Sequence, residues 1–280
     1  MATLGLIAGE GKLPFQVADQ ARADGERVVA VAFRGSASPD LAEHVDRFYW
    51  VGLARLGSII RYLKREGATS AVMAGRVHHR HAIKPLKIVR HLPDWSTLVF
   101  WYRRLHGDLR ADAILTAFAD ALGDQGIEVE SSVERVPHLT IEPGCLTRRQ
   151  PTQRERRDIK LGWHVAKAMG GLDVGQAVIV KEGVVVAVEA VEGTDETIQR
   201  GGELGHGGVV VVKVAKPNQD LRFDVPTVGV GTVKAMIAGG ARVLAIEAGK
   251  TLLLEQDRFV RAADEADLTV IACTNDEMNG

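Results

Sequence analysis

Short runs of β-branched and apolar residues alternate with stretches of helical periodicity through the first half of this 280-residue chain. We expect the runs to form strands, at residues 4–8, 27–33, 47–51 and 69–74. Between the last two runs, apolar residues recur on one helical face, at Leu56, Ile59, Ile60 and Leu63. Strands that alternate with helices are typical of βαβ units, whose strands are parallel. The pattern therefore predicts a Rossmann-like parallel sheet in the N-terminal half.

The second half has the pattern of a mixed α/β domain. Residues 175–191 hold two apolar runs around Glu182-Gly183, as in a β-hairpin, and residues 207–215 supply a third strand. Strand and helix patterns then alternate from 231 to 273. We expect a sheet that contains both parallel and antiparallel strands.

A change of composition separates the two halves. Residues 143–151 combine Pro, Gly and basic residues with little periodicity, which is typical of a linker. Thr152 and Glu155 then have the spacing of a capping box that opens a helix. The expected organisation is an N-terminal domain of residues 1–142, a linker of residues 143–151 and a C-terminal domain of residues 152–280.

Composition excludes several classes of protein. The chain has 35 basic and 36 acidic residues, so its net charge does not favour nucleic acid as a partner. Cys145 and Cys273 are too few for a disulfide framework or a cysteine zinc site. The first residues lack the pattern of a signal peptide, and no apolar stretch approaches the roughly 18 residues that span a bilayer. We expect a cytoplasmic protein with reduced cysteines.

The densest group of charged residues follows the strand at 207–215. It contains two lysines, an arginine and two aspartates: Lys213, Lys216, Asp220, Arg222 and Asp224. Cations of this kind bind diphosphates, and carboxylates hold Mg²⁺ or orient a water. A polar loop whose charges pair with one another fits the spacing equally well.

Two further groups of polar residues follow predicted strands. Thr194 and Asp195 come after the hairpin, and Asp195 would share a cation with Asp224 if the strand ends converge, although either residue is more often a helix N-cap. Glu189 is unusually polar for its strand, and Glu247-Ala-Gly249-Lys250 forms another polar loop at a strand end. These groups are weaker candidates than the run from 213 to 224.

The N-terminal half holds two candidate anion sites. Gly9-Glu10-Gly11-Lys12 joins a strand to a helix, where backbone N–H groups cradle phosphates, but it matches neither common phosphate motif, and a plain tight turn is the simpler interpretation. Residues 76–95 concentrate positive charge beside apolar residues, and Arg76 and Lys84 are candidates to grip a phosphate. A solvated helix fits equally well, and the histidines there lack the partners of a zinc site.

Taken together, these segments resemble the LpxI family of UDP-2,3-diacylglucosamine diphosphatases over almost the whole chain. The matching pieces are residues 5–9 with Leu13-Pro14, residues 75–77, Gly107-Asp108, and residues 172–178, 188–195 and 216–227. The resemblance implies two domains that clamp a lipid between them, a Mg²⁺ requirement, and an aspartate needed for hydrolysis that matches Asp224. Glu10 departs from the glycine expected at its position, which leaves the path of that loop open.

The resulting hypothesis is hydrolysis of UDP-2,3-diacylglucosamine to UMP and 2,3-diacylglucosamine 1-phosphate (lipid X). Mg²⁺ would be held by Asp224 with Asp195 or Asp220, while Lys213, Lys216 and Arg222 stabilise the transition state. The other candidate substrate-binding residues are Gly9, Glu10, Gly11, Lys12, Arg76, Lys84, Gln219 and Thr194. Alternatives are a sugar-nucleotide transferase and a non-catalytic lipid- or nucleotide-binding protein. A homodimer is the default expectation, and the lipid substrate implies transient contact with the inner membrane.

Overall fold

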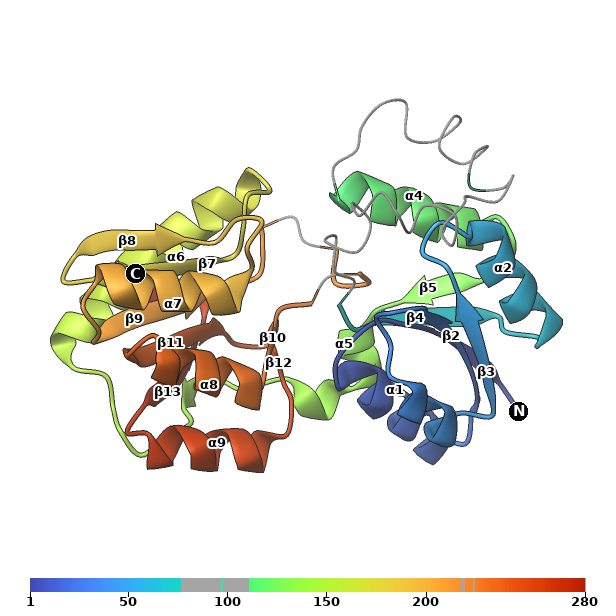
Figure 1. Cartoon of the computed structure of the whole chain (residues 1–280), viewed down its shortest axis with the longest axis horizontal. Helices are drawn as coiled ribbons and strands as arrows, with labels where there is room; N and C mark the ends of the chain where they lie inside the picture. Colours follow the sequence, from blue (N-terminus) through green and yellow to red (C-terminus); the bar gives the residue numbers. More distant parts are fainter. Residues whose placement is uncertain (77–96, 98–110, 218–219, 224, 280) are drawn as a thin grey trace. The chain divides into compact units, whose positions relative to one another are not determined.

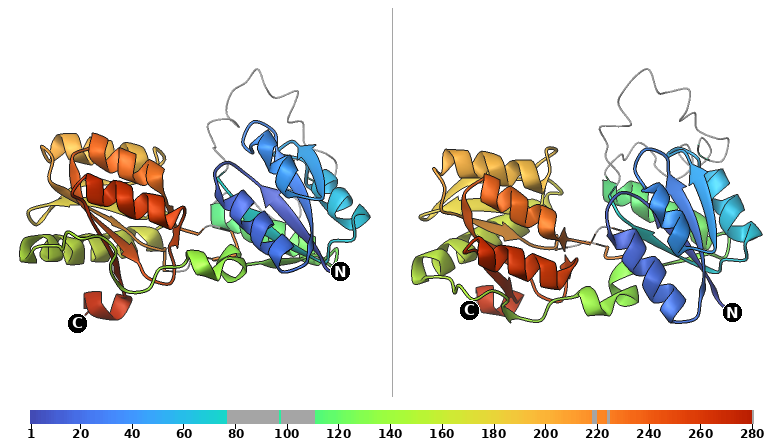
Figure 2. Two further views of the ribbon diagram at one scale, coloured as in Figure 1. Left: turned by 90° about the horizontal axis from the view of Figure 1, so that it is seen from below. Right: turned by 60° about the horizontal axis from the view of Figure 1, so that its bottom comes forward.

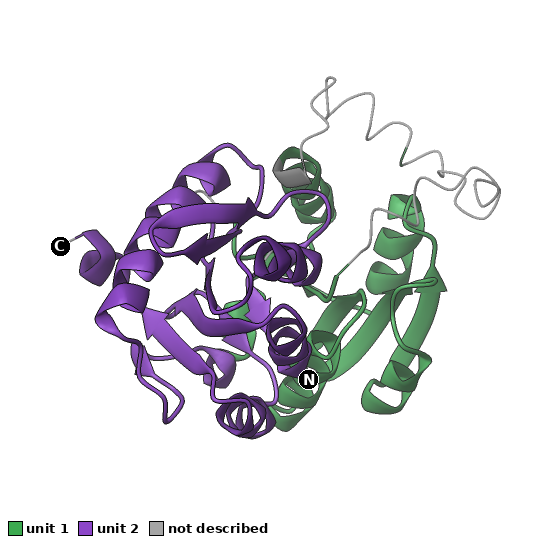
Figure 3. Cartoon of the chain, turned by 60° about the vertical axis from the view of Figure 1, so that its left-hand side comes forward, with its two compact units in different colours: residues 1–136, 220–223 green, residues 137–219, 224–280 purple. Residues whose placement is uncertain are grey.

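The chain folds into two compact units that interrupt each other in sequence (Figure 3). The structure is a computed structural model that describes residues 1–76, 97, 111–217, 220–223 and 225–279. Unit 1 consists of Met1–Val136 and Asp220–Phe223, and unit 2 of Pro137–Gln219 and Asp224–Gly280. The chain therefore passes from one unit to the other three times.

Unit 1 is built on the parallel sheet that the sequence predicts. Five strands pair in the order β3-β2-β1-β4-β5, and every pairing is parallel. The strands are β1 Thr3–Ala8, β2 Arg27–Phe33, β3 Arg47–Val51, β4 Ser70–Ala74 and β5 Glu128–Glu130. The central strands are fully buried, which explains their continuous apolar runs.

Helices cover both faces of this sheet, as βαβ connections require (Figure 1). They are α1 Leu13–Ala23, α2 Leu56–Arg65, α4 Ala111–Gly123 and α5 Ser132–Arg135, with a 3₁₀ turn at Pro39–His44. One apolar cluster joins Ile59 of α2 and Leu122 of α4 to Ile7 and Val31 of the sheet. Helices α2 and α4 therefore share one face, while α1 packs beside α5.

Unit 2 contains the expected mixed sheet, with six strands in the order β6-β13-β11-β9-β7-β8. Strands β13, β11 and β9 are parallel, whereas β6, β7 and β8 each run antiparallel to a neighbour. The strands are β6 Gly144–Cys145, β7 Ala177–Lys181, β8 Val184–Val188, β9 Val209–Lys213, β11 Ala241–Glu247 and β13 Thr269–Cys273. Strands β10 Thr227–Val228 and β12 Leu252–Leu253 form a separate parallel pair.

The helices of unit 2 divide between the two faces of its sheet (Figure 2). They are α6 Gln153–Gly171, α7 Thr194–Leu204, α8 Val230–Ala238, α9 Gln256–Glu265 and α10 Asn275–Asn279, with a 3₁₀ turn at Pro137–Leu139. Helix α6 covers one face through Trp163, which packs with Val212 and Ala245. Helices α7, α8 and α9 cover the other. No helix within the described part of the chain is long and apolar enough to cross a bilayer.

Helix α6 begins where the capping box predicts. The Thr152 hydroxyl accepts a hydrogen bond from the Glu155 N–H at 3.2 Å, and the Glu155 carboxylate accepts one from the Thr152 N–H at 2.7 Å. These two bonds satisfy donors that the first helical turn leaves free. The cap therefore fixes the start of α6, the longest helix among the described residues, at Gln153.

The segment expected to be a linker, residues 143–151, lies instead in unit 2. Gly144–Cys145 form β6 and pair with β13. The buried Thr147 hydroxyl accepts a hydrogen bond from the Val270 N–H, and Arg149 donates to Thr269 and Glu155. The polar residues of this segment thus form hydrogen bonds to the neighbouring strand β13. Unit 1 ends at Val136 and unit 2 begins at Pro137.

Candidate functional site

The charged residues of unit 2 gather at one edge of its sheet. Parallel strands β9 and β11 end there at Lys213 and Glu247, and antiparallel β7 begins beside Lys213 at Ala177. The N–H of Glu189 bonds to the Ala177 carbonyl, which brings Glu189 to the same edge. Lys213, Glu189 and Glu247 are only 7%, 8% and 2% exposed. Buried charges require partners, so their contacts define the site.

Lys213 and Glu189 lie on the face that α7 and α8 cover. Side chains alternate along a strand, and Val211 of β9 and Ala187 of the hairpin belong to the apolar cluster on that face. The Lys213 Nζ donates to the Thr227 carbonyl oxygen at 3.1 Å. A buried ammonium at the end of a strand can bind an anion strongly.

Glu189 is held by residues that precede and follow the β7–β8 hairpin. Its carboxylate accepts hydrogen bonds from the Thr194 hydroxyl at 2.8 Å and from the Gln176 N–H at 3.3 Å. Thr194, a predicted substrate-binding residue, is therefore turned toward Glu189. The N-cap of α7 is Gly193, so Thr194 and Asp195 occupy the first turn and not the cap that their sequence suggests.

Glu247 lies on the opposite face, beneath α6. Its carboxylate accepts hydrogen bonds from Lys167 at 2.6 Å and from the Ala215 N–H at 2.8 Å, and Lys250 approaches to 3.1 Å. Burial lowers the pKa of Lys167, and the hydrogen bond to Glu247 opposes that shift. The sequence marks Glu247 as a polar strand end, but it gives no sign of Lys167, which lies 80 positions away.

The loop that follows β9 begins with Lys216 tied to the end of α6. The Lys216 Nζ lies 2.5 Å from the Asp173 carboxylate, and both side chains are largely buried. Asp173 follows α6 with a positive φ of 56°, a conformation that aspartate tolerates better than most residues. Lys216 is thus placed at the same edge as Lys213 and Glu247. Asp173 is another residue that sequence reasoning missed.

The next part of the loop, residues 220–223, belongs to unit 1. Arg222 donates to both carboxylate oxygens of Asp220, at 2.5 to 3.0 Å. These hydrogen bonds lower the pKa of Asp220. The Ser131 hydroxyl donates to the Leu221 carbonyl at 3.0 Å, and Phe223 packs against the core of unit 1. The predicted run of charges is therefore split between the two units.

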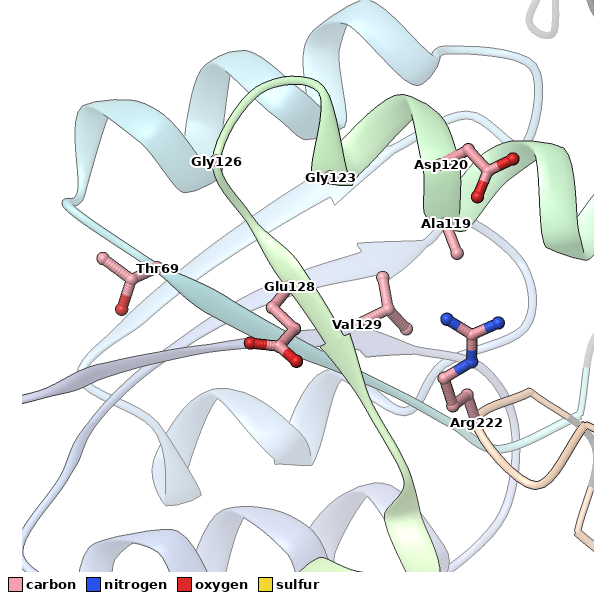
Figure 4. A pocket seen from close by; sticks show the side chains of 8 residues that line it. All are labelled: Thr69, Ala119, Asp120, Gly123, Gly126, Glu128, Val129 and Arg222. Atoms are coloured by element: carbon pink, nitrogen blue, oxygen red, sulfur yellow. The ribbon is translucent and has the colours of Figure 1, made fainter.

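Arg222 also lines a surface hollow of unit 1, shown in Figure 4. The hollow has a volume of about 520 Å³, and Asp120 and Glu128 line it from α4 and β5. The guanidinium group lies 4.9 Å from the centre of the Phe223 ring, a cation–π contact. Arg222 is thus oriented by Asp220 and Phe223 from its own segment.

The loop Gly9-Glu10-Gly11-Lys12 is closed against the end of β4. Glu10 and Arg76 exchange two backbone hydrogen bonds of 2.8 and 2.9 Å, and the Gly9 N–H bonds to Ala74. A Cβ on Gly9 would lie 2.5 Å from the Arg76 carbonyl oxygen, so this approach requires glycine. The N–H groups of Gly9 and Glu10 are therefore already used in backbone hydrogen bonds.

The remaining candidates concern the metal and the residues outside the described part of the chain. Lys84, Gln219 and Asp224 lie outside it, as does almost all of the basic segment 76–95. Within the described residues, no three His, Cys, Asp or Glu side chains gather as a metal site. Mg²⁺ commonly needs only one or two protein carboxylates besides phosphate oxygens, and Asp195 is of the right chemical type. A metal at Asp220 would have to displace Arg222.

Comparison with known proteins places these features in a family context. The model of the LpxI N-terminal domain matches residues 3–139, and that of the LpxI C-terminal domain matches residues 142–271. The UDP-2,3-diacylglucosamine pyrophosphatase LpxI of Caulobacter vibrioides is 33% identical over an alignment of 282 positions, which covers 97% of each chain.

Two solved structures give much weaker matches. The biotin carboxylase domain of a single-chain bacterial carboxylase is 15% identical with a TM-score of 0.27, over 69% of this chain and 38% of that one. The biotin carboxylase subunit of pyruvate carboxylase is 12% identical with a TM-score of 0.28, over 74% and 42%. The present chain spans less than half the length of either.

Proposed function

The chain belongs to the LpxI family, and we propose on this ground that it hydrolyses the pyrophosphate bond of UDP-2,3-diacylglucosamine. The products are UMP and 2,3-diacylglucosamine 1-phosphate. The observation that carries the proposal is the end-to-end similarity to the Caulobacter enzyme of that name, 33% identical over 97% of both chains. Water is the nucleophile in this proposal.

The charged edge of unit 2 supports the proposal chemically. A pyrophosphate is a dense anion, and its hydrolysis depends mainly on positioning and on stabilisation of negative charge. Lys213 and Lys216 supply two cations at that edge, and burial strengthens their interaction with an anion. In our proposal Lys213 and Lys216 bind phosphate oxygens, and the substrate takes the place of Asp173 beside Lys216.

Asp224 is the proposed catalytic aspartate and the first protein ligand of Mg²⁺. The assignment rests on the motif at residues 216–227, since Asp224 lies outside the described residues. When bound, Mg²⁺ would neutralise charge on the phosphates. Asp195 is the proposed second carboxylate. Asp220 instead orients Arg222, because both of its oxygens already accept hydrogen bonds from that guanidinium.

Two proposals about partners follow from the substrate. A diacylated lipid resides in a membrane, so the enzyme must reach the membrane surface to collect it, and we propose a transient contact there. A homodimer stays our default proposal for assembly. Sedimentation with and without phospholipid vesicles tests both.

Turnover of the lipid tests the central proposal. Purified protein is incubated with UDP-2,3-diacylglucosamine in Mg²⁺ or in EDTA, and UMP release is followed by chromatography. We expect metal-dependent release that falls by at least about a hundredfold in Asp224→Asn, since the variant keeps the shape but loses the charge. Asp257→Asn, at an exposed position in the first turn of α9, is the matched control. Saturable lipid binding without UMP release would contradict the proposal.

A further inference from the structure

One buried ion pair holds both backbone polar groups of Ala215, its N–H and its carbonyl oxygen. Its N–H donates to the Glu247 carboxylate at 2.8 Å, and its carbonyl oxygen accepts a hydrogen bond from the Lys167 Nζ at 2.9 Å. Lys167 and Glu247 also bond to each other at 2.6 Å. Their side chains are 17% and 3% exposed. The three groups form a closed ring of hydrogen bonds where the chain leaves β9.

Stability alone is a weak explanation for this arrangement. A buried ion pair often contributes little compared with apolar residues of the same size, because both charges lose their hydration. The charges here do something that apolar side chains cannot do, since they bond the donor and the acceptor of Ala215 at once. Lys250 adds a further contact to the same carboxylate at 3.1 Å. The pair therefore fixes the direction of the loop that Ala215 begins.

The last turn of α6 fixes the next two residues by close packing. A Cβ built on Gly170 would lie 3.1 Å from the Lys216 Cα and 3.2 Å from both the Lys216 Cγ and the Pro217 Cδ. The backbone of the loop thus rests directly on the helix at Gly170. Lys167, Gly170 and Asp173 are spaced three residues apart, and each contacts the loop.

We propose that Lys167, Gly170 and Glu247, which we call the clamp, are positioning residues that hold Ala215–Pro217 so that Lys216 meets the phosphate in the transition state. The inference rests on the proposed function and deepens it. None of the three residues needs to touch the substrate. The clamp fixes the backbone at Lys216, and the position of that backbone determines where the Lys216 ammonium group lies.

Two neighbouring glycines provide a test that separates position from stability. Gly170→Ala inserts a methyl group between α6 and the loop, whereas Gly171→Ala meets nothing within 4 Å. Alanine favours a helix more than glycine does, so both variants are expected to fold. We expect kcat for UMP release to fall roughly tenfold or more in Gly170→Ala, because small displacements at a reacting centre are costly. Gly171→Ala should turn over like the wild type.

A second pair of variants removes charge instead of adding volume. Glu247→Gln weakens the bonds to Lys167 and Ala215, and we expect a lower kcat, a smaller change in KM and faster hydrogen exchange at the Ala215 amide. Glu155→Gln is the control, because Glu155 is a partly buried carboxylate (14% exposed, against 3% for Glu247) that is paired with Arg149 at the far end of α6. It should lower the melting temperature without lowering kcat at a temperature well below the transition.

The outcomes distinguish the clamp from the proposed function. If the wild type releases UMP and both Gly170→Ala and Glu247→Gln match their controls in kcat, the clamp is overturned and the proposed function stands. If the wild type releases no UMP with Mg²⁺ present, the proposed function is overturned, and the catalytic role of the clamp with it. A lower kcat in both variants and in neither control supports the clamp.

Discussion

Ser131 donates its hydroxyl hydrogen to the carbonyl oxygen of Leu221 at 3.0 Å, across 90 positions of sequence. The same hydroxyl accepts a hydrogen bond from the Val133 N–H and caps α5. The segment 220–223 is thereby tied to the end of β5, and Phe223 packs against the core of unit 1. Residues 220–223 are therefore anchored in unit 1, although the residues before and after them in the sequence belong to unit 2.

Phe223→Ala should destabilise unit 1, although the residue lies far from that unit in sequence. We expect a loss of about 1–3 kcal/mol, less than for a fully buried phenylalanine because Phe223 is partly exposed. Urea unfolding, combined with hydrogen exchange in β4 and β5, measures the effect. Leu172→Ala is the control, since Leu172 is 77% exposed. Unchanged exchange in β5 would contradict the anchoring role.

Lys213→Met should lower turnover by roughly a hundredfold, because the variant preserves size but removes a buried cation from the proposed phosphate site. Lys181→Met is the matched control. Lys181 ends β7 at the opposite edge of the same sheet and donates to the Gly207 carbonyl at 2.8 Å, much as Lys213 donates to Thr227. Steady-state kinetics on both variants checks the prediction, and equal losses of kcat would point to a general loss of structure.

The contribution of Glu66 to stability should depend on pH. Hydrogen bonds from Arg27 and Tyr49, each 2.6 Å long, lower the pKa of its carboxyl from 4.5 to about 2. The folded state thus binds this proton less readily than the unfolded state does, so the stabilisation is complete above pH 4.5 and is lost as the pH falls toward 2. We expect Glu66→Gln to be less stable than the wild type at pH 7.

Urea unfolding at pH 7, 5, 4 and 3 measures this dependence. The difference in unfolding free energy between the wild type and Glu66→Gln should narrow once the pH is below 4.5. A difference that stays constant down to pH 3 would show that the Glu66 carboxylate is not held by these hydrogen bonds.

Cys273 should be protected from alkylation in the folded protein. The residue is 2% exposed, and burial raises the pKa of its thiol from 9.0 to about 11. The thiolate is the reactive form, so at pH 8 both access and ionisation oppose the reaction. Mass spectrometry after iodoacetamide treatment should find Cys273 labelled only when urea unfolds the protein. Rapid labelling without urea would contradict its burial beneath α6.

Periodicity predicted the architecture because each half obeys a simple local rule. The apolar runs of β1 and β2 are buried on both faces, and the spacing of Leu56, Ile59 and Leu63 matches the buried side of α2. The structure places residues 143–151 in unit 2, and their prolines, glycine and arginines give the same sequence pattern whether they face water or bond to an edge strand. Only the long-range pairing of Gly144 with Ala272 shows that the segment pairs with a strand.

The site was predictable only in part, for a related reason. Parallel strands end at one edge of a sheet, so the sequence could place Lys213 and Lys216 there. Asp173, the partner of Lys216, comes from the turn after α6, and Lys167, the partner of Glu247, lies within that helix, where a lysine is an ordinary residue. Pairing of charges within the loop was one of the two interpretations, and Arg222 and Asp220 do pair, but the sequence gave no sign that this pair belongs to unit 1.

The three passages of the chain between the units have a consequence for genetic exchange. A recombination event near codon 136 would transfer most of unit 1 to a new host protein, but it would leave Leu221 and Phe223 behind in the donor. The transplanted half would then carry an unfilled place in its core and a Ser131 hydroxyl that has lost its acceptor at Leu221. The two halves therefore do not form freely exchangeable modules, and a working chimera must carry residues 220–223 together with the first 136.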